Sequence, residues 1–170
     1  EFSKTENMEL SAVNPVAVMG PVLGKDFSHS NQIVRAMLTG QMPFLLKIGF
    51  DYVDVRDVAD LHLLAMTRPE AVGERFLATT TENLTYKEEA EILRRSLGDA
   101  AGKVPTTEMP DFIVRFLALF MKDLRMPATF LGQNTACSNA KAKKLLGWQP
   151  RSAEEAIVAT AKSMVEFGLV

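Results

Sequence analysis

Apolar residues along the chain follow two patterns, short runs and stretches with helical spacing. Runs bounded by Pro, Gly or Asn predict strands at 10–13, at 52–55 and within 73–79, and apolar residues continue after Pro15 to Met19. Spacings of three and four residues predict helices at 31–39, 58–67, 86–97, 111–122, 139–146 and 153–167, with 126–135 irregular. Strands that alternate with helices in this way are typical of an α/β fold.

The predicted sheet has few strands. Only the strands around Val13 and Leu77 have the apolar character of strands buried on both faces. A doubly wound sheet needs more of them, so the remaining strands would have to come from upstream. Pro15 has no N–H for a strand ladder, and regular pairing is expected to stop there.

Polar residues mark where several of these helices begin. Two helices start with the Ser/Thr-x-x-Glu spacing of a capping box, Thr85–Glu88 and Ser152–Glu155. Asp57 is expected to cap the second predicted helix, and Ser28 or Ser30 the first. The helix at 111–122 has a wide apolar face, which we expect to be core on one side with a few residues bordering a pocket.

Composition narrows the class of protein. With 170 residues, 47% of them hydrophobic, the chain is long enough for one domain with its own core. A net charge of −2 gives no basic field for nucleic acid. The closest approach to a membrane span, 112–121, is too short and contains Arg115, so no membrane segment is expected. Cys137 is the single cysteine, which excludes an internal disulfide and favours a reducing, cytoplasmic compartment.

The sequence lacks a self-sufficient active site. It contains no G-x-G-x-x-G turn, P-loop or G-x-S-x-G elbow. Tyr52 and Tyr86 are not followed four residues later by lysine, so neither forms a Tyr-x-x-x-Lys pair. His29 and His62 have no metal-ligand spacing, and we expect no metal. His62 is expected to be a partly buried structural residue. No catalytic residue is therefore assigned to this chain.

Four motifs in a fixed order carry a family resemblance. They are VNPVAVMGP at 13–21, DYVDVRDVA at 51–59, GERF at 73–76 and LGWQPR at 146–151. Together they resemble the carboxyl-terminal half of extended short-chain dehydrogenases/reductases, in the NAD-dependent epimerase/dehydratase superfamily. The similarity is greatest to dihydroflavonol-reductase-like and aldehyde-reductase-like members, and it extends from Phe2 to the end of the chain.

The resemblance implies a fold and a division of the chain. The expected fold is the carboxyl-terminal part of an extended Rossmann-type, doubly wound α/β fold, with a mostly helical substrate-binding portion and a few parallel strands. Residues 1–24 would end the catalytic helix and add a strand to the Rossmann sheet. Residues 25–170 would bind substrate, with 73–98 returning a strand and a helix to that sheet. The catalytic Tyr and Lys would lie just upstream of residue 1, and the Gly-rich dinucleotide turn further upstream.

The resemblance also implies which residues meet the cofactor. Asn14, Pro15, Val16 and Val18 would line the nicotinamide, with the proline on its ring and nearby backbone groups at the carboxamide. The alternative for Asn14-Pro15 is a simple strand terminator. Ser30, and less directly Ser28, would contact the cofactor phosphates at a helix start, where free amides favour anions; helix capping alone also explains serine there.

The segment before the strand at 52–55 is expected to reach the substrate. Phe50 could stack on a ring, and Asp51 could hydrogen-bond a hydroxyl group. The alternative for Asp51 is a solvated loop acid. Neither assignment specifies the substrate or decides between NAD and NADP.

The expected parent protein is an NAD(P)-dependent oxidoreductase that acts on a carbonyl or alcohol carbon of a small molecule. This chain alone is expected to be inactive and not to bind NAD(P), because the amino-terminal Rossmann half is missing. Uncovered strand edges would favour self-association or pairing with that half. Two alternatives stay open. One is a non-enzymatic binding or regulatory module of the same family, and the other is a sugar-nucleotide epimerase or dehydratase, although no basic cluster for a diphosphate is evident.

Overall fold

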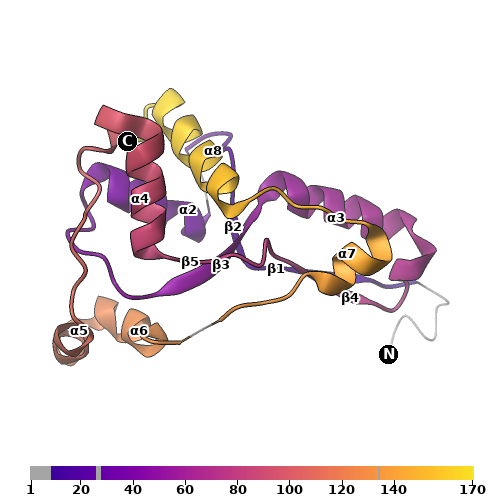
Figure 1. Cartoon of the computed structure of the whole chain (residues 1–170), viewed down its shortest axis with the longest axis horizontal. Helices are drawn as coiled ribbons and strands as arrows, with labels where there is room; N and C mark the ends of the chain where they lie inside the picture. The colour runs from indigo at the N-terminus through magenta and orange to yellow at the C-terminus, as the bar shows by residue number, and fades with distance from the viewer. Residues whose placement is uncertain (1–8, 26–27, 134) are drawn as a thin grey trace.

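The computed structural model describes residues 9–25, 28–133 and 135–170 as an α/β fold (Figure 1). The strands are β1 (Ala12–Pro15), β2 (Ala17–Met19), β3 (Gly49–Asp54), β4 (Arg75–Ala78) and β5 (Asn83–Thr85). The α-helices are α2 (His29–Thr39), α3 (Val55–Thr67), α4 (Tyr86–Leu97), α5 (Asp111–Leu117), α6 (Lys122–Phe130), α7 (Ala140–Leu146) and α8 (Ala153–Glu166). Short 3-10 turns lie at η1 (Pro69–Ala71) and η2 (Gly98–Ala101).

The extended segment 12–19 pairs with two different strands. Its first part, β1, pairs in parallel with β4, and its second part, β2, pairs in parallel with β3. The antiparallel strand β5 completes the second sheet, in the order β2-β3-β5. A single stretch of chain therefore connects two small sheets.

Strand β1 and its register with β4 end at Pro15, as expected, and the chain then changes partner to β3. Pro15 is in register with Ala78, and the next residue, Val16, donates its N–H to the Ala78 carbonyl oxygen at 3.2 Å. In a parallel ladder alternate residues direct their N–H groups to opposite neighbours. The missing N–H of Pro15 therefore lies on the side of β1 away from β4, where it removes no bond to that strand.

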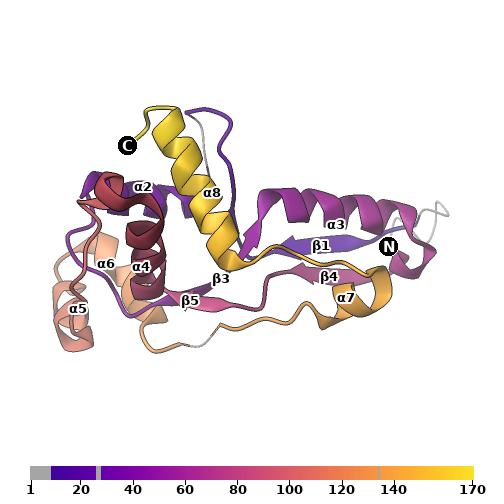
Figure 2. The same cartoon turned by 45° about the horizontal axis from the view of Figure 1, so that its top comes forward.

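Two apolar cores divide the molecule, which is elongated in Figures 1 and 2. The first core lies among α2, α4, α8, β2 and β3. The second lies where α3 and α7 cover the β1–β4 sheet, and it includes Phe76 and Trp148. Within 73–98, the strand β4 joins β1, whereas the helix α4 packs against α8 and β5.

The β1–β4 sheet is open on one face, so its two strands are not buried on both faces in the described part of this chain. Along β4, Phe76 and Ala78 are fully buried, but Leu77 is 38% exposed. Its register neighbour on β1, Asn14, is exposed as well. The described residues supply this sheet with two strands only. The covered face is core, and no further strand among residues 9–25, 28–133 and 135–170 pairs with the outer edges.

Helix α3 starts earlier than expected. Asp54, not Asp57, is its N-cap, and an Asp54 carboxylate oxygen accepts a hydrogen bond from the Arg56 backbone N–H at 2.9 Å. The Arg56 side chain also donates to both Asp54 oxygens, at 2.8 and 2.7 Å. Because β3 runs directly into α3, the last strand residue takes the capping position.

Asp57 instead attaches the segment between α7 and α8 to α3. Its carboxylate accepts a hydrogen bond from the backbone N–H of Arg151 at 2.8 Å and pairs with the Arg151 guanidinium. The backbone carbonyl of Asp57 accepts a bond from Trp148 Nε1 at 3.0 Å. The expectation that His62 is partly buried is wrong. His62 lies on α3 and is exposed, with its Nδ1 atom 2.8 Å from the Val58 carbonyl oxygen.

The helix expected at 111–122 is broken. Helix α5 ends at Leu117, Met121 has an extended backbone, and α6 then runs through the segment expected to be irregular, with Pro127 inside it. The Arg125 side chain donates to the carbonyls of Ala118 and Leu119, both at 3.3 Å. These bonds satisfy carbonyl groups that the end of α5 leaves without helical partners.

The apolar face of α5 and its following turn is exposed rather than mostly core. Only Val114 of α5 is buried, while Phe112, Phe116 and Phe120 are 72%, 60% and 73% exposed. Phe116 and Phe120 contact each other edge to face, with ring centroids 5.5 Å apart. Among the described residues, no helix is long and apolar enough to cross a bilayer.

Candidate functional site

A small hollow lies between the second sheet and the first turns of α2. Its volume is about 170 Å³, and its lining is formed by Ala17, Met19, His29, Ser30, Ile33, Phe50 and Tyr52. Strand residues two apart lie on one face of a sheet, so β2 and β3 each contribute a pair of side chains to one wall. Pockets for whole ligands are commonly about 300–1,000 Å³. The hollow therefore has room for one ring, and not for a dinucleotide.

The structure brings two of the proposed site residues together at this hollow, Ser30 from α2 and Phe50 from β3. Ser28 lies just outside, where its Oγ accepts a hydrogen bond from the Asn31 N–H at 3.5 Å as the N-cap of α2. The helix start therefore adjoins the hollow, with Ser30 at it and Ser28 in the capping role.

Val16 and Val18 lie on the other side of the strand. Both are partly buried and pack against the second core, away from the hollow. Only their backbone groups remain for a ligand on the hollow side. The side chains at the hollow are Ala17 and Met19, which the sequence reasoning missed. The alternation of strand side chains was the signal that could have identified them.

Asn14 and Pro15 are exposed at the carboxyl end of β1, where the segment changes partner from β4 to β3. In open α/β sheets, ligands bind beyond the carboxyl ends of parallel strands. The position of Asn14-Pro15 between the open sheet and the hollow fits that rule.

Asp51 is not part of the hollow lining. It is 4% exposed, and its Oδ1 accepts a hydrogen bond from Asn83 Nδ2 at 2.9 Å. Its Oδ2 accepts bonds from Thr79 Oγ1 at 3.3 Å and from the Cys137 N–H at 2.6 Å. With both oxygens occupied, Asp51 connects β3 to the loops that follow β4 and α6, and it is not a solvated acid.

Aromatic rings continue the wall of the hollow outward. The Phe50 ring lies 5.8 Å from the Tyr86 ring and 6.0 Å from the Phe130 ring, measured between centroids. Tyr86 opens α4 and Phe130 ends α6, so three elements meet at Phe50. Behind the hollow, the Tyr52 hydroxyl donates a hydrogen bond to Glu89 Oε2 at 2.8 Å.

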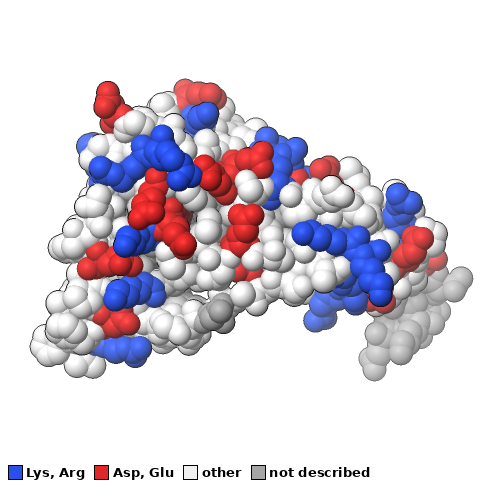
Figure 3. All heavy atoms as spheres, viewed as in Figure 1, with Lys and Arg blue, Asp and Glu red and all other residues white. Residues whose placement is uncertain are grey.

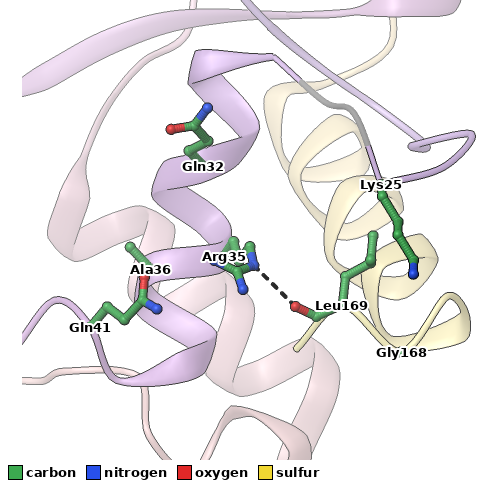
Figure 4. A pocket seen from close by; sticks show the side chains of 7 residues that line it. All are labelled: Lys25, Gln32, Arg35, Ala36, Gln41, Gly168 and Leu169. Carbon is green, nitrogen blue, oxygen red and sulfur yellow. Dashed lines mark hydrogen bonds between the residues drawn. The ribbon is translucent and has the colours of Figure 1, made fainter.

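A larger hollow of about 930 Å³ lies elsewhere, between α2 and the end of the chain (Figure 4). Lys25, Gln32 and Gln41 line it together with Arg35, whose Nε donates to the Leu169 carbonyl oxygen at 3.1 Å. This contact attaches the last residues to α2. None of the proposed site residues lines this hollow.

Charge and metal chemistry add no further site. Lys and Arg side chains are interspersed with Asp and Glu over the face shown in Figure 3. In the described part of the chain, no group of three or more His, Cys, Asp or Glu residues could hold a metal ion.

Comparison with known proteins identifies the class. No protein-family model matches the chain. A Saccharomyces cerevisiae oxidoreductase is 32% identical over 166 residues, 92% of this chain and 42% of the relative. The NADPH-dependent methylglyoxal reductase of the same yeast is 29% identical, over 94% of this chain and 44% of the relative. The structure of yeast methylglyoxal/isovaleraldehyde reductase complexed with NADPH superimposes with a TM-score of 0.73 at 27% identity, covering 98% of this chain and 47% of that one.

The chain thus has the Rossmann-type architecture of NAD(P)-dependent reductases, matched over their carboxyl-terminal portions. It belongs to the extended short-chain dehydrogenase/reductase family. It spans less than half the length of the curated relatives described above. The fold expected from the four sequence motifs is confirmed, as is the family.

Proposed function

We propose that this chain is the substrate-side part of an NAD(P)-dependent oxidoreductase that acts on a carbonyl or alcohol carbon. The observation that carries the proposal is the meeting of Ser30 and Phe50 at one ring-sized hollow beside the Asn14-Pro15 strand end. Two relatives named as methylglyoxal and ketone reductases support the carbonyl class.

The residues of this chain would bind and orient, and would not move a proton. A bound nicotinamide would supply the hydride. Ala17, Met19 and Phe50 would exclude water from the reacting face, since their side chains give the hollow a mostly apolar wall. Pro15 would pack on the nicotinamide ring, with nearby backbone groups at its carboxamide, and the α2 start at Ser30 would favour a phosphate oxygen. We assign no substrate contact to Asp51, whose oxygens are occupied within the protein.

The open β1–β4 sheet is the proposed attachment point for the rest of the enzyme. Segment 12–15 and the strand in 73–98 would belong to the Rossmann sheet. Their free edges would pair with amino-terminal strands, and their uncovered face would be covered by the same half. The catalytic Tyr-Lys pair and the dinucleotide turn would come from that half. The chain by itself would then neither turn over substrate nor hold the whole cofactor.

A chimera tests this proposal. The amino-terminal half of yeast methylglyoxal reductase is joined ahead of residue 9, and NADPH oxidation is measured with aldehydes and dihydroflavonol-like ketones. We expect activity from the chimera and none from the chain alone. A Phe50→Ala chimera should lose carbonyl reduction, whereas Phe112→Ala, on the exposed face of α5, is the matched control and should retain it.

Two outcomes would contradict the proposal. Clear turnover by the chain alone would show that a catalytic group has been overlooked. A folded chimera that binds NADPH but reduces no carbonyl would favour the non-enzymatic module instead.

A further inference from the structure

A buried carboxyl group lies directly behind the hollow. Glu89 of α4 is fully buried, and its Oε2 accepts the hydrogen bond from the Tyr52 hydroxyl at 2.8 Å. The Tyr52 side chain, which is 1% exposed, forms part of the hollow wall. One hydrogen bond therefore connects a titratable group of the first core to a side chain of the candidate site.

Stability alone does not explain this pair. A buried carboxylate is strongly disfavoured unless its oxygens are well paired. The second oxygen, Oε1, has no hydrogen-bond partner among the described residues. Burial raises the pKa of Glu89 to about 7, although the Tyr52 hydrogen bond opposes the shift. A phenylalanine and an apolar residue at the two positions would fill the core without this cost.

We propose that Glu89 is a positioning residue, which holds the Tyr52 ring in place at the hollow through the hydrogen bond to its hydroxyl. A charged acceptor binds a phenol more strongly than a neutral one. The carboxylate therefore draws Tyr52 toward α4, and the neutral acid allows the ring to shift toward the hollow. Only the assignment of the hollow to nicotinamide or substrate rests on the proposed function.

Two buried phenols are the titratable neighbours of Glu89 in the first core. They are Tyr52 of β3 and Tyr86 of α4; burial, followed by the Glu89 charge, raises the pKa of both phenols. The buried residues of α8 and η2, which pack against α4, are all uncharged, as is β5. Neither phenol ionises near neutral pH. His29 of α2 also lines the hollow beside Met19, so a change at Met19 is assigned to Glu89 only where Glu89→Gln, which leaves His29 in place, removes it.

The test uses the whole chain labelled with ¹³C in its methionine methyl groups. Met19 lines the hollow and is 1% exposed, while Met126 on α6 is 69% exposed and serves as the control. We expect the Met19 methyl shift to titrate with a midpoint of about 7, and the Met126 shift to show no such midpoint. Glu89→Gln, which keeps an acceptor for Tyr52 without the charge, should abolish the Met19 transition.

Tyr52→Phe separates positioning from burial. It removes the hydroxyl but keeps the ring, so Glu89 can still ionise while Met19 should no longer respond. A Met19 transition that persists in Tyr52→Phe would overturn the proposal, and so would a wild-type Met19 signal without a midpoint near 7. If one variant fails to fold, the titration of the wild-type Met19 signal can still overturn the proposal.

The pH dependence of the chimera distinguishes this proposal from the proposed function. In an active chimera, the KM for the carbonyl should be roughly twofold higher at pH 6 than at pH 8. Glu89→Gln should remove this difference in KM and leave the ratio of the kcat values at the two pH values unchanged. An inactive chimera with a normal Met19 transition would reject the proposed function and leave Glu89 as a positioning residue. An active chimera whose KM is independent of pH, without the Met19 transition, would reject the role of Glu89 alone.

Discussion

The β1–β4 and β2–β3–β5 sheets share the segment 12–19 but are covered very differently. Around the second sheet, α2, α4 and α8 enclose a large apolar core, and the hollow is the space that remains. The β1–β4 sheet has α3 and α7 on its covered face, while Asn14 and Leu77 are exposed on the other. The segment 12–19 is therefore exposed on one face in β1 and lies within the enclosed region in β2.

The region around the second sheet is enclosed by helices of this chain, whereas the β1–β4 sheet needs a further segment to cover it. In the region of the second sheet, the buried Asp51 has both carboxylate oxygens paired with groups of the same chain. In the part of the chain that the structure describes, the β1–β4 sheet instead has no further paired strand at its edges, and proteins normally cover or protect such edges. In the proposed enzyme the amino-terminal half would provide that cover.

The largest expected effect contrasts one leucine from each region. Leu93 on α4 is fully buried in the first core, so Leu93→Ala should lower the free energy of unfolding by about 2–5 kcal/mol. Leu77 is 38% exposed, and Leu77→Ala should cost less than about 0.5 kcal/mol. Urea unfolding followed by circular dichroism measures both. Equal losses would mean that the open face is covered in solution.

A smaller effect is expected at Asp54, which lies where β3 of one region becomes α3 of the other. Burial would raise its pKa, but the hydrogen bonds and charge of Arg56 hold the pKa below its usual value. Its stabilising contribution is therefore present above the unfolded-state pKa, near 3.8, and is lost as the pH falls through the lower folded-state value. Asp54→Ala should cost about 1–2 kcal/mol at pH 7, because the helix cap is lost.

Unfolding experiments between pH 7 and pH 3 check this prediction. The difference between wild type and Asp54→Ala should shrink toward low pH. Asp54→Asn, which can still cap α3 but cannot pair with Arg56 as an ion, should fall between the two at pH 7. A difference that is constant with pH would show that the charge of Asp54 contributes nothing.

Local sequence signals predicted much of this fold because they depend on neighbouring residues. Both capping boxes form, at Thr85–Glu88 and at Ser152–Glu155. Gly40 ends α2 in the left-handed conformation, as expected for a helix stop. The strand–helix order and the family motifs likewise predicted the Rossmann-type architecture.

The site depended on contacts that local patterns do not contain. Glu88, Glu89 and Glu91 form an acidic stretch that looks like a solvated helix face. Glu89 is nevertheless fully buried, because α8 packs against α4 and Tyr52 of β3 contacts its carboxylate. Asp51 looked like a loop acid until the bonds from Thr79 and Cys137 were seen. The sequence predicted that Phe50 and Ser30 lie near a ligand only through the family resemblance. The hollow between β2, β3 and α2 could not be predicted from the sequence.

The smallest effect on folding should come from Leu77→Lys, which nevertheless tests the open sheet most directly. A lysine on an exposed strand face keeps its charge in water, so the unfolding free energy should change by less than about 0.5 kcal/mol. Exposed apolar strand surface favours association, and a charge there opposes it.

In sedimentation velocity the wild-type chain should therefore self-associate, and Leu77→Lys should shift it toward monomer. Leu63→Lys, at a 61% exposed position on α3, is the matched control and should associate like the wild type. In the chimera the amino-terminal half would cover Leu77, so there the same lysine should impair folding instead. A wild-type chain that is monomeric at all concentrations would contradict association through this sheet.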